Sequence, residues 1–236
     1  MDLKMILFDL DGTLLPMDND EFTKAYFKLL SKKLLPLAYD PNALVDAVWT
    51  GTYAMIGNDG SRTNEDAFWQ TFAQKIGKEN VLDDMPVFMD FYRNEFQQSR
   101  AMCGFNPMAA EAVKRIKEAG YRVALATNPI FPSVATESRI GWAGLSPADF
   151  ELFTTYENTG YCKPNPDYYR DVCERLGVLP EECLMVGNDV TDDGSAALTG
   201  MKIFFETDWL INRKNEDISA YPNGTFEDLL EYLNLM

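Results

Sequence analysis

The sequence predicts an α/β protein whose core is a doubly wound parallel sheet, with a block of helices inserted after the first strand. Two observations lead to this prediction. From about residue 105 onward, short apolar runs that end in polar residues alternate with helical segments. Between residues 18 and 100, in contrast, every periodic segment has helical spacing. Because alternating strands and helices are typical of a parallel sheet covered on both faces, the all-helical stretch is expected to be an insertion into that sheet.

The chain opens with a short strand, which is followed by a run of helices. The apolar segment KMILFD at residues 4–9 predicts a buried parallel strand, and Gly12-Thr13 predicts the turn after it. Four helices are predicted next, bounded by capping residues, prolines and glycines. The first three begin near Asp18, at Asp40, and at Thr63 or Asn64, and the fourth carries residues 88–96. Six aromatic residues of this block have helical spacing and are interpreted as core: Phe68, Trp69, Phe72, Phe88, Phe91 and Phe96.

Residues 105–236 return to an alternation of strands and helices. Helices are predicted over residues 108–119, 166–176 and 225–235, and strands over residues 121–127, 183–187 and 202–205. Gly120 and Gly177 follow two of these helices directly, as expected where a helix ends. Together with the first strand, these segments supply the predicted sheet and its covering layers.

Composition narrows the possible chemistry. The chain has 236 residues and a formal net charge of -16, so neither a nucleic-acid backbone nor an anionic membrane surface is expected as a partner. It contains no histidine, which excludes Ser-His and Cys-His catalytic pairs and histidine-ligated zinc. Chemistry near neutral pH must therefore come from carboxylates, lysine, cysteine, tyrosine or a hard metal ion.

Cysteine usage and the lack of a targeting pattern bear on location. The four cysteines form no C-x-x-C pair, and no basic start is followed by an apolar signal segment. No apolar run reaches the roughly 18 residues that a membrane-spanning helix needs. A protein of the reducing cytoplasm is expected, and no pattern indicates an oligomeric state.

Three polar residues fall at the carboxyl ends of predicted strands. Asp9, Thr127 and Asp189 each follow an apolar run, although long stretches of chain separate them. In an open parallel sheet, ligands bind in the crevice outside this edge. The three segments are therefore expected to meet at one site.

Four motifs extend this pattern and resemble those of the haloacid-dehalogenase superfamily in order and spacing. They are FDLDGTLL at 8–15, ALATN at 124–128, CKPNP at 162–166 and MVGNDVTDD at 185–193. The resemblance implies a Rossmann-like core of residues 1–15 and 105–236, with residues 16–104 as an inserted helical cap domain. It also implies a Mg²⁺-dependent phosphatase that acts on a small phosphorylated metabolite.

The resemblance assigns a role to each motif. Asp9 would be the nucleophile and Asp11 the general acid/base, and the chemistry agrees with these roles. A carboxylate can attack phosphorus to form an acyl phosphate, while a second carboxyl group two residues away protonates the leaving oxygen and later activates water. Thr127 and Asn128 would donate hydrogen bonds to phosphoryl oxygens. Lys163 would neutralise the Asp9 carboxylate and the charge that develops on the phosphoryl group.

Several of these carboxylates are expected to share a metal ion. Asp9, Asp11 and the acidic residues between 189 and 193 cannot all stay ionised at close range without a cation, and an all-oxygen site beside a phosphate is typical of Mg²⁺. Many relatives have Asp directly after the fourth-motif glycine, whereas here Asn188 follows Gly187. Asp189 is therefore interpreted as the direct ligand. The outer carboxylate is assigned to Asp193, with Asp192 as the alternative.

Other activities are compatible with the same motifs. Dehalogenases of the superfamily lack the second acidic residue of the first motif, so Asp11 argues against that reaction. A phosphonatase would need a cap lysine for a Schiff base, and a sugar-phosphate mutase would need a cap that excludes water. A protein that only binds a phosphorylated ligand would have no need of Asp11 as an acid/base.

Overall fold

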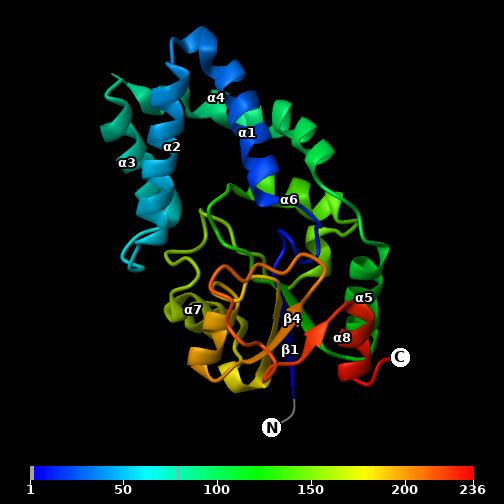
Figure 1. Cartoon of the computed structure of the whole chain (residues 1–236). Helices are drawn as coiled ribbons and strands as arrows, with labels where there is room; N and C mark the ends of the chain where they lie inside the picture. The colour runs from blue at the N-terminus through cyan, green and yellow to red at the C-terminus, as the bar shows by residue number, and fades with distance from the viewer. Residues whose placement is uncertain (1–2, 79) are drawn as a thin grey trace.

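The computed structural model describes residues 3–78 and 80–236, and the predicted α/β fold is confirmed (Figure 1). Five parallel strands form one sheet in the order β2-β1-β3-β4-β5. The strands are β1 Met5–Phe8, β2 Arg122–Leu125, β3 Cys183–Gly187, β4 Lys202–Glu206 and β5 Asn223–Gly224. The sequence pattern predicted the first four, but not β5, whose two residues are too few to show a period.

Helices cover both faces of this sheet, and alternate residues of the interior strand β1 pack against the two helical layers. Ile6 and Phe8 of β1 belong to one hydrophobic cluster and Met5 and Leu7 to another. The first cluster includes residues of α5 Pro107–Glu118 and α8 Phe226–Tyr232, and the second includes residues of α7 Pro166–Leu176. Helix α8 ends earlier than predicted. Helix α6 Ser133–Trp142 and three 3-10 helices, Pro147–Asp149, Pro180–Glu182 and Gly194–Thr199, complete this part of the chain.

All elements between β1 and α5 are helical and lie beyond the carboxyl ends of the strands (Figure 1). They are α1 Asn19–Leu34, α2 Pro41–Ile56, α3 Asn64–Ile76 and α4 Met85–Arg93, with 3-10 helices at Leu35–Leu37, Val81–Asp84 and Glu95–Met102. The six aromatic residues interpreted as core are buried, as predicted. This helical insertion is entered and left at one place, where the Gly104 N–H donates to the Pro16 carbonyl at 2.7 Å and Met17 bridges to Cys103.

The predicted fourth helix is wrong in one respect, because it is two elements instead of one. Helix α4 stops at Arg93, and a 3-10 helix starts at Glu95. The Asn94 side chain donates to the Asp90 carbonyl and to the Asp90 carboxylate, at 3.1 and 2.8 Å. Asparagine competes in this way with the hydrogen bonds of a continuing helix, so the aromatic period of residues 88–96 spans a break. No helix in the described chain is both long and apolar enough to cross a bilayer.

Candidate active site

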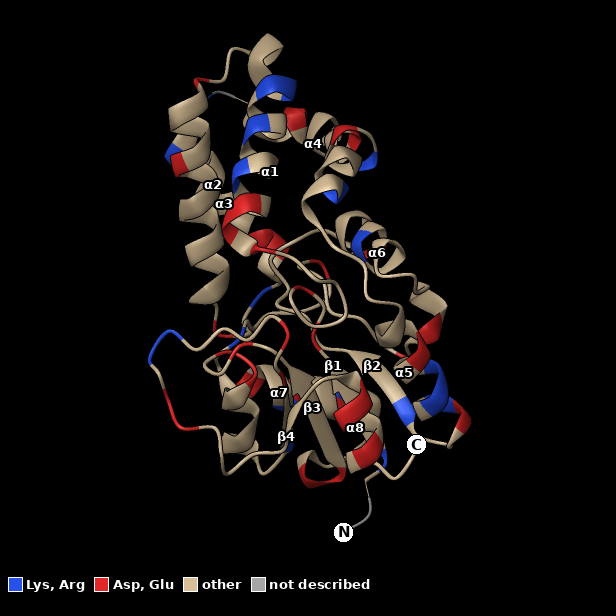
Figure 2. Cartoon of the chain, turned by 45° about the vertical axis from the view of Figure 1, so that its right-hand side comes forward, with Lys and Arg blue, Asp and Glu red and all other residues tan. Residues whose placement is uncertain are grey.

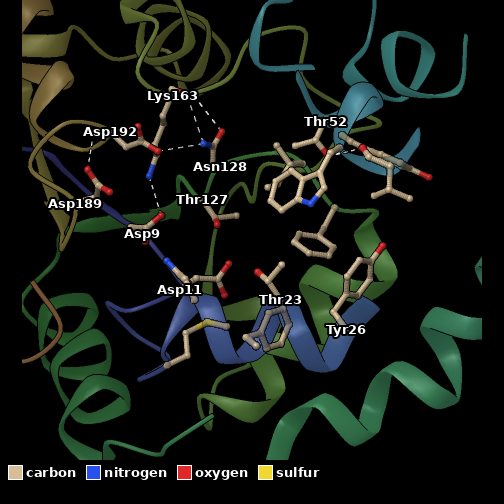
Figure 3. Close-up of a pocket in the computed structure, with 18 of the residues that line it drawn as sticks. Asp9, Asp11, Thr23, Tyr26, Thr52, Thr127, Asn128, Lys163, Asp189 and Asp192 are labelled. Carbon is tan, nitrogen blue, oxygen red and sulfur yellow. Dashed lines mark hydrogen bonds and ion pairs between the residues drawn. The ribbon is translucent and has the colours of Figure 1, made fainter. Parts of the chain in front are cut away.

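The residues that the sequence assigned to a site lie together at the carboxyl edge of the sheet, next to helices of the insertion (Figure 3). All of them line one cavity: Asp9, Asp11, Thr127, Asn128, Lys163, Asp189 and Asp193. The β1 strand positions the two residues of the first motif, and β2 and β3 end beside it. Acidic residues occupy the loops between the sheet and the insertion (Figure 2). The predicted convergence of distant segments on one crevice is therefore observed.

A buried lysine lies between two carboxylates at the centre of this edge. Lys163 Nζ donates to Asp9 Oδ1 at 2.8 Å and to Asp193 Oδ1 at 2.6 Å, and the lysine is 2% exposed. Burial alone would lower the pKa of Lys163, but Asp193 and Asp9 hold it well above the usual value. One positive charge does not fully neutralise two carboxylates. Burial therefore raises the pKa of Asp9 to about 7, although Lys163 acts to lower it.

The second and third motifs fasten this lysine in place. The Lys163 backbone N–H donates to Asn128 Oδ1 at 3.2 Å, and Asn128 Nδ2 donates to Asp192 at 3.3 Å. The Thr127 carbonyl accepts hydrogen bonds from the Thr154 hydroxyl, at 2.6 Å, and from the Tyr168 hydroxyl, at 2.8 Å. These bonds anchor the backbone of Thr127, whose side chain lies at the cavity (Figure 3).

The fourth motif folds into a tight loop around Asp189. One Asp189 carboxylate oxygen accepts hydrogen bonds from the backbone N–H groups of Thr191 and Asp192, at 2.8 and 3.0 Å. Asp193 lies deeper, because its Oδ1 accepts from Lys163 and its Oδ2 accepts from the Asp189 N–H at 2.9 Å. A Cβ on Gly187 would lie 2.2 Å from the Asp193 carboxyl carbon, so only glycine leaves room for this carboxylate. The choice between Asp193 and Asp192 as the outer metal carboxylate stays a prediction.

Arg139 is a site residue that the sequence interpretation missed. It lies on α6, is 1% exposed, and donates from Nη1 to Asp11 Oδ2. Its guanidinium carbon lies 4.4 Å from the centre of the Phe131 ring, and Nη2 donates to the Thr136 hydroxyl at 3.3 Å. No motif includes Arg139, so nothing in the sequence pattern marked it. The pair leaves Asp11 Oδ1 as a buried oxygen with no hydrogen-bond partner.

Thr13 was also missed, although it stands inside the first motif. Its hydroxyl lies 3.4 Å from Asp9 Oδ2 and 3.2 Å from Asn188 Oδ1, close enough to hydrogen-bond with either. Gly12 has a φ of +84°, and a Cβ there would lie 2.2 Å from the Asn188 amide nitrogen. The glycine and threonine of this motif therefore join the first and fourth motifs beside Asp9.

The carboxylates at this edge are suited to a hard divalent cation. Burial and the neighbouring Asp189 raise the pKa of Asp192 to about 6, and Asp11 Oδ1 lacks a partner within the protein. Oxygen donors without histidine are the ligands that Mg²⁺ prefers. Across residues 3–78 and 80–236, no three acidic or cysteine side chains already converge as a metal cluster. Binding of an ion would therefore have to draw these carboxylates closer together.

The fold and the site define an α/β enzyme whose reactive groups are carboxylates and a buried lysine at the edge of a parallel sheet. A family model described as haloacid dehalogenase-like hydrolase matches residues 3–199. The chain belongs to this family of hydrolases, and the resemblance seen in its four motifs is confirmed.

Individual relatives span almost the same length. A phosphoglycolate phosphatase of Psychrobacter arcticus is 26% identical over 245 residues, which cover 99% of this chain and 96% of the relative. The (S)-2-haloacid dehalogenase 4A of Burkholderia cepacia is 26% identical, over 84% of this chain and 80% of its own. A haloacid-dehalogenase-type phosphatase from Thermococcus onnurineus has a TM-score of 0.60 at 19% identity, with 99% of both chains covered. The hydrolase YfnB of Bacillus subtilis, described as bound to magnesium, has a TM-score of 0.57 at 19% identity, over 99% of this chain and 100% of that one. The two structures show a shared fold.

Proposed function

We propose that this hydrolase is a Mg²⁺-dependent phosphatase that cleaves a small phosphomonoester through an aspartyl phosphate on Asp9. The observation that carries the proposal is the arrangement at the end of β1, where Asp9 and Asp11 face one cavity and Lys163 Nζ lies 2.8 Å from Asp9 Oδ1. A binding protein would need the lysine to hold a phosphate but would have no use for a second carboxyl group beside the first.

The residues divide the reaction into two displacements. Asp9 attacks phosphorus, and the leaving oxygen takes a proton from Asp11. Asp11 then accepts a proton from the water that hydrolyses the acyl phosphate. Arg139 occupies Asp11 Oδ2, so the unpartnered Oδ1 is the atom available for both proton transfers. Lys163 and the Thr127 and Asn128 side chains stabilise the charge on the phosphoryl oxygens.

The metal ion is proposed to be held by Asp9, Asp11, Asp189 and Asp193. When bound, Mg²⁺ would neutralise charge on the phosphoryl oxygens and make the phosphorus more electrophilic. Two observations support this assignment: the four carboxyl groups line one cavity, and the chain has no histidine, so its ligands are the oxygen donors that Mg²⁺ prefers. The description of YfnB as bound to magnesium agrees with it.

Residues 16–104 are proposed to act as the cap domain over a core of residues 1–15 and 105–236. The cap contributes the far wall of the cavity, and so the contacts to the leaving group. None of its lysines lines this cavity in the described chain: Lys24, Lys28, Lys32, Lys33, Lys75 and Lys78 all lie elsewhere. The phosphonatase alternative needs a cap lysine at the reacting carbon, so the geometry favours a phosphatase. The net charge of -16 favours a small phosphorylated metabolite over a nucleic acid.

Phosphate release from a panel of phosphate esters tests the proposal. The protein should hydrolyse at least one ester with Mg²⁺, lose this activity in EDTA, and lose it equally in Asp9→Asn. If no ester is turned over with any divalent metal, or if Asp9→Asn retains the activity, the proposed function is wrong.

A further inference from the structure

The cavity has two chemically different ends. Its volume is about 330 Å³, at the small end of the range for ligand pockets. One end holds the carboxylates and Lys163 (Figure 3). The other, here called the aromatic end, is formed by side chains of the helical insertion: Phe22, Phe27, Trp49, Phe68, Trp69 and Phe88. Trp69 packs edge-on against both Phe68 and Phe88, with ring centres 5.2 and 5.1 Å away, so this wall is rigid.

The aromatic end offers no charge to a ligand. In the described chain, no Lys, Arg, Asp or Glu of residues 16–104 lines the cavity. Among the residues that the structure describes, two cations line the cavity, Lys163 and Arg213, and both lie outside residues 16–104. Lys163 is already engaged by two carboxylates, and Arg213 lies 3.8 Å from Asp189. A second anionic group on the substrate would therefore enter an apolar wall without a partner, which is costly.

Two polar groups in this wall do not change its apolar character. Trp69 and Tyr156 are 5% and 4% exposed, and both line the cavity. The indole Nε1 and the phenol oxygen have almost no accessible surface, so a ligand in the cavity meets the rings and not these polar atoms. Burial raises the pKa of Tyr156, so the phenol stays neutral.

We propose that the substrate is a phosphate monoester whose leaving group is neutral and carries an aromatic ring. The proposal rests on the proposed function, and it separates this enzyme from its relatives that are named for phosphoglycolate, an ester with a second anionic group. The phosphate would lie at the carboxylate end, and the ring would pack against Trp69 and its neighbours.

Three benzyl phosphates of nearly equal leaving-group basicity test this substrate class: unsubstituted, 4-carboxamide and 4-carboxylate. The carboxamide and the carboxylate have the same shape and differ in charge. We expect the kcat/KM of the carboxylate to be more than about tenfold below that of the carboxamide, and that of phosphoglycolate to be lower still. If the two anionic esters react as fast as the neutral ones, the inference is wrong while the phosphatase stands. If none of these esters reacts while another ester of the panel does, the inference is wrong; if no ester of the panel reacts with any divalent metal, the proposed function itself has failed.

Variants of the cavity wall test whether the leaving group binds at the aromatic end. Trp69→Ala removes part of the aromatic wall, so the ratio of kcat/KM for the unsubstituted benzyl ester over phosphoglycolate should fall at least about fivefold, because the ring loses a packing partner. The matched control is Trp142→Ala, which alters a buried tryptophan outside the cavity wall and should leave that ratio unchanged. Thr23 lies on α1 at the cavity (Figure 3). Thr23→Lys should raise the kcat/KM of the carboxylate ester relative to that of the carboxamide ester. An unchanged preference in both wall variants would place the leaving group elsewhere.

Discussion

Replacing Lys163 with methionine removes the charge that lies between Asp9 and Asp193 and keeps much of the side-chain volume. The lysine nitrogen is 2.8 Å from one carboxylate and 2.6 Å from the other, and it is almost fully buried. Removing one partner of a buried ion pair typically costs about 3–5 kcal/mol, because the remaining charge is left without a partner. For a chain of this size, about 2–4 °C per kcal/mol translates this loss into a melting temperature lower by roughly 6–20 °C.

The measurement is a thermal melt in EDTA at pH 7.5, beside denaturant unfolding of the same protein. Lys202→Met, on an exposed position of β4, is the matched control and should change stability by less than about 0.5 kcal/mol. Adding Asp193→Asn to Lys163→Met removes one of the two orphaned carboxylates and should recover at least about 1 kcal/mol. A loss as small as that of Lys202→Met would refute the reasoning, because it would mean that the buried charges are not coupled to folding.

Three further predictions concern the carboxylates. Burial raises the pKa of Asp9 to about 7 and that of Asp192 to about 6, above the ordinary value of 3.8. The folded protein therefore holds these protons more tightly than the unfolded chain. The stability that they contribute is complete below pH 3.8 and is lost as the pH rises through 6 to 7. Metal-free protein should therefore melt lower at pH 8 than at pH 5.5, with Mg²⁺ narrowing the gap, and equal melts would contradict this. Asp11→Asn should release a burst of phenol about equal to the enzyme concentration from an aryl phosphate and then stall as an acyl phosphate, whereas Asp9→Asn should give no burst. Rapid-quench assays measure the burst, and turnover by Asp9→Asn would mean that another residue is the nucleophile. Arg139→Met should slow hydrolysis of an alkyl phosphate by roughly 10²-fold or more and that of an aryl phosphate by much less, because Asp11 loses its orientation as an acid; an equal loss on both esters would limit Arg139 to a role in folding.

The parts of this molecule that follow from local pattern were predicted well. Strands β1 and β3 are buried on both faces and therefore read as unbroken apolar runs, and the polar residues that end them mark the edge where the site forms. The candidate site residues were predicted from four motifs, which follow one another in the sequence in the order that the family resemblance implies. Helix starts such as Thr63 carry capping signals that depend on three or four neighbouring residues.

The parts that depend on docking between distant segments were not predicted. Arg139 reaches Asp11 only because α6 packs beside the end of β1, and its own neighbours in sequence carry no sign of that contact. Phe68, Trp69 and Phe88 show the helical spacing of core residues, yet they also line the cavity. A period of 3.6 residues shows which face of a helix avoids water, but does not tell a packed neighbour from a ligand.

The position of β1 between β2 and β3 affects how the chain folds during synthesis. Its hydrogen-bonding partners begin at residue 122 in β2 and at residue 183 in β3, whereas the helical insertion is complete by residue 102. During synthesis at about 5–20 residues per second, the apolar strand MILF leaves the ribosome roughly 10–35 s before its last partner. The helices, built from nearer contacts, can pack in that interval. We therefore expect a nascent chain from which residue 104 has left the ribosome, but residue 183 has not, to protect its helices from protease while its first residues stay open to chaperones.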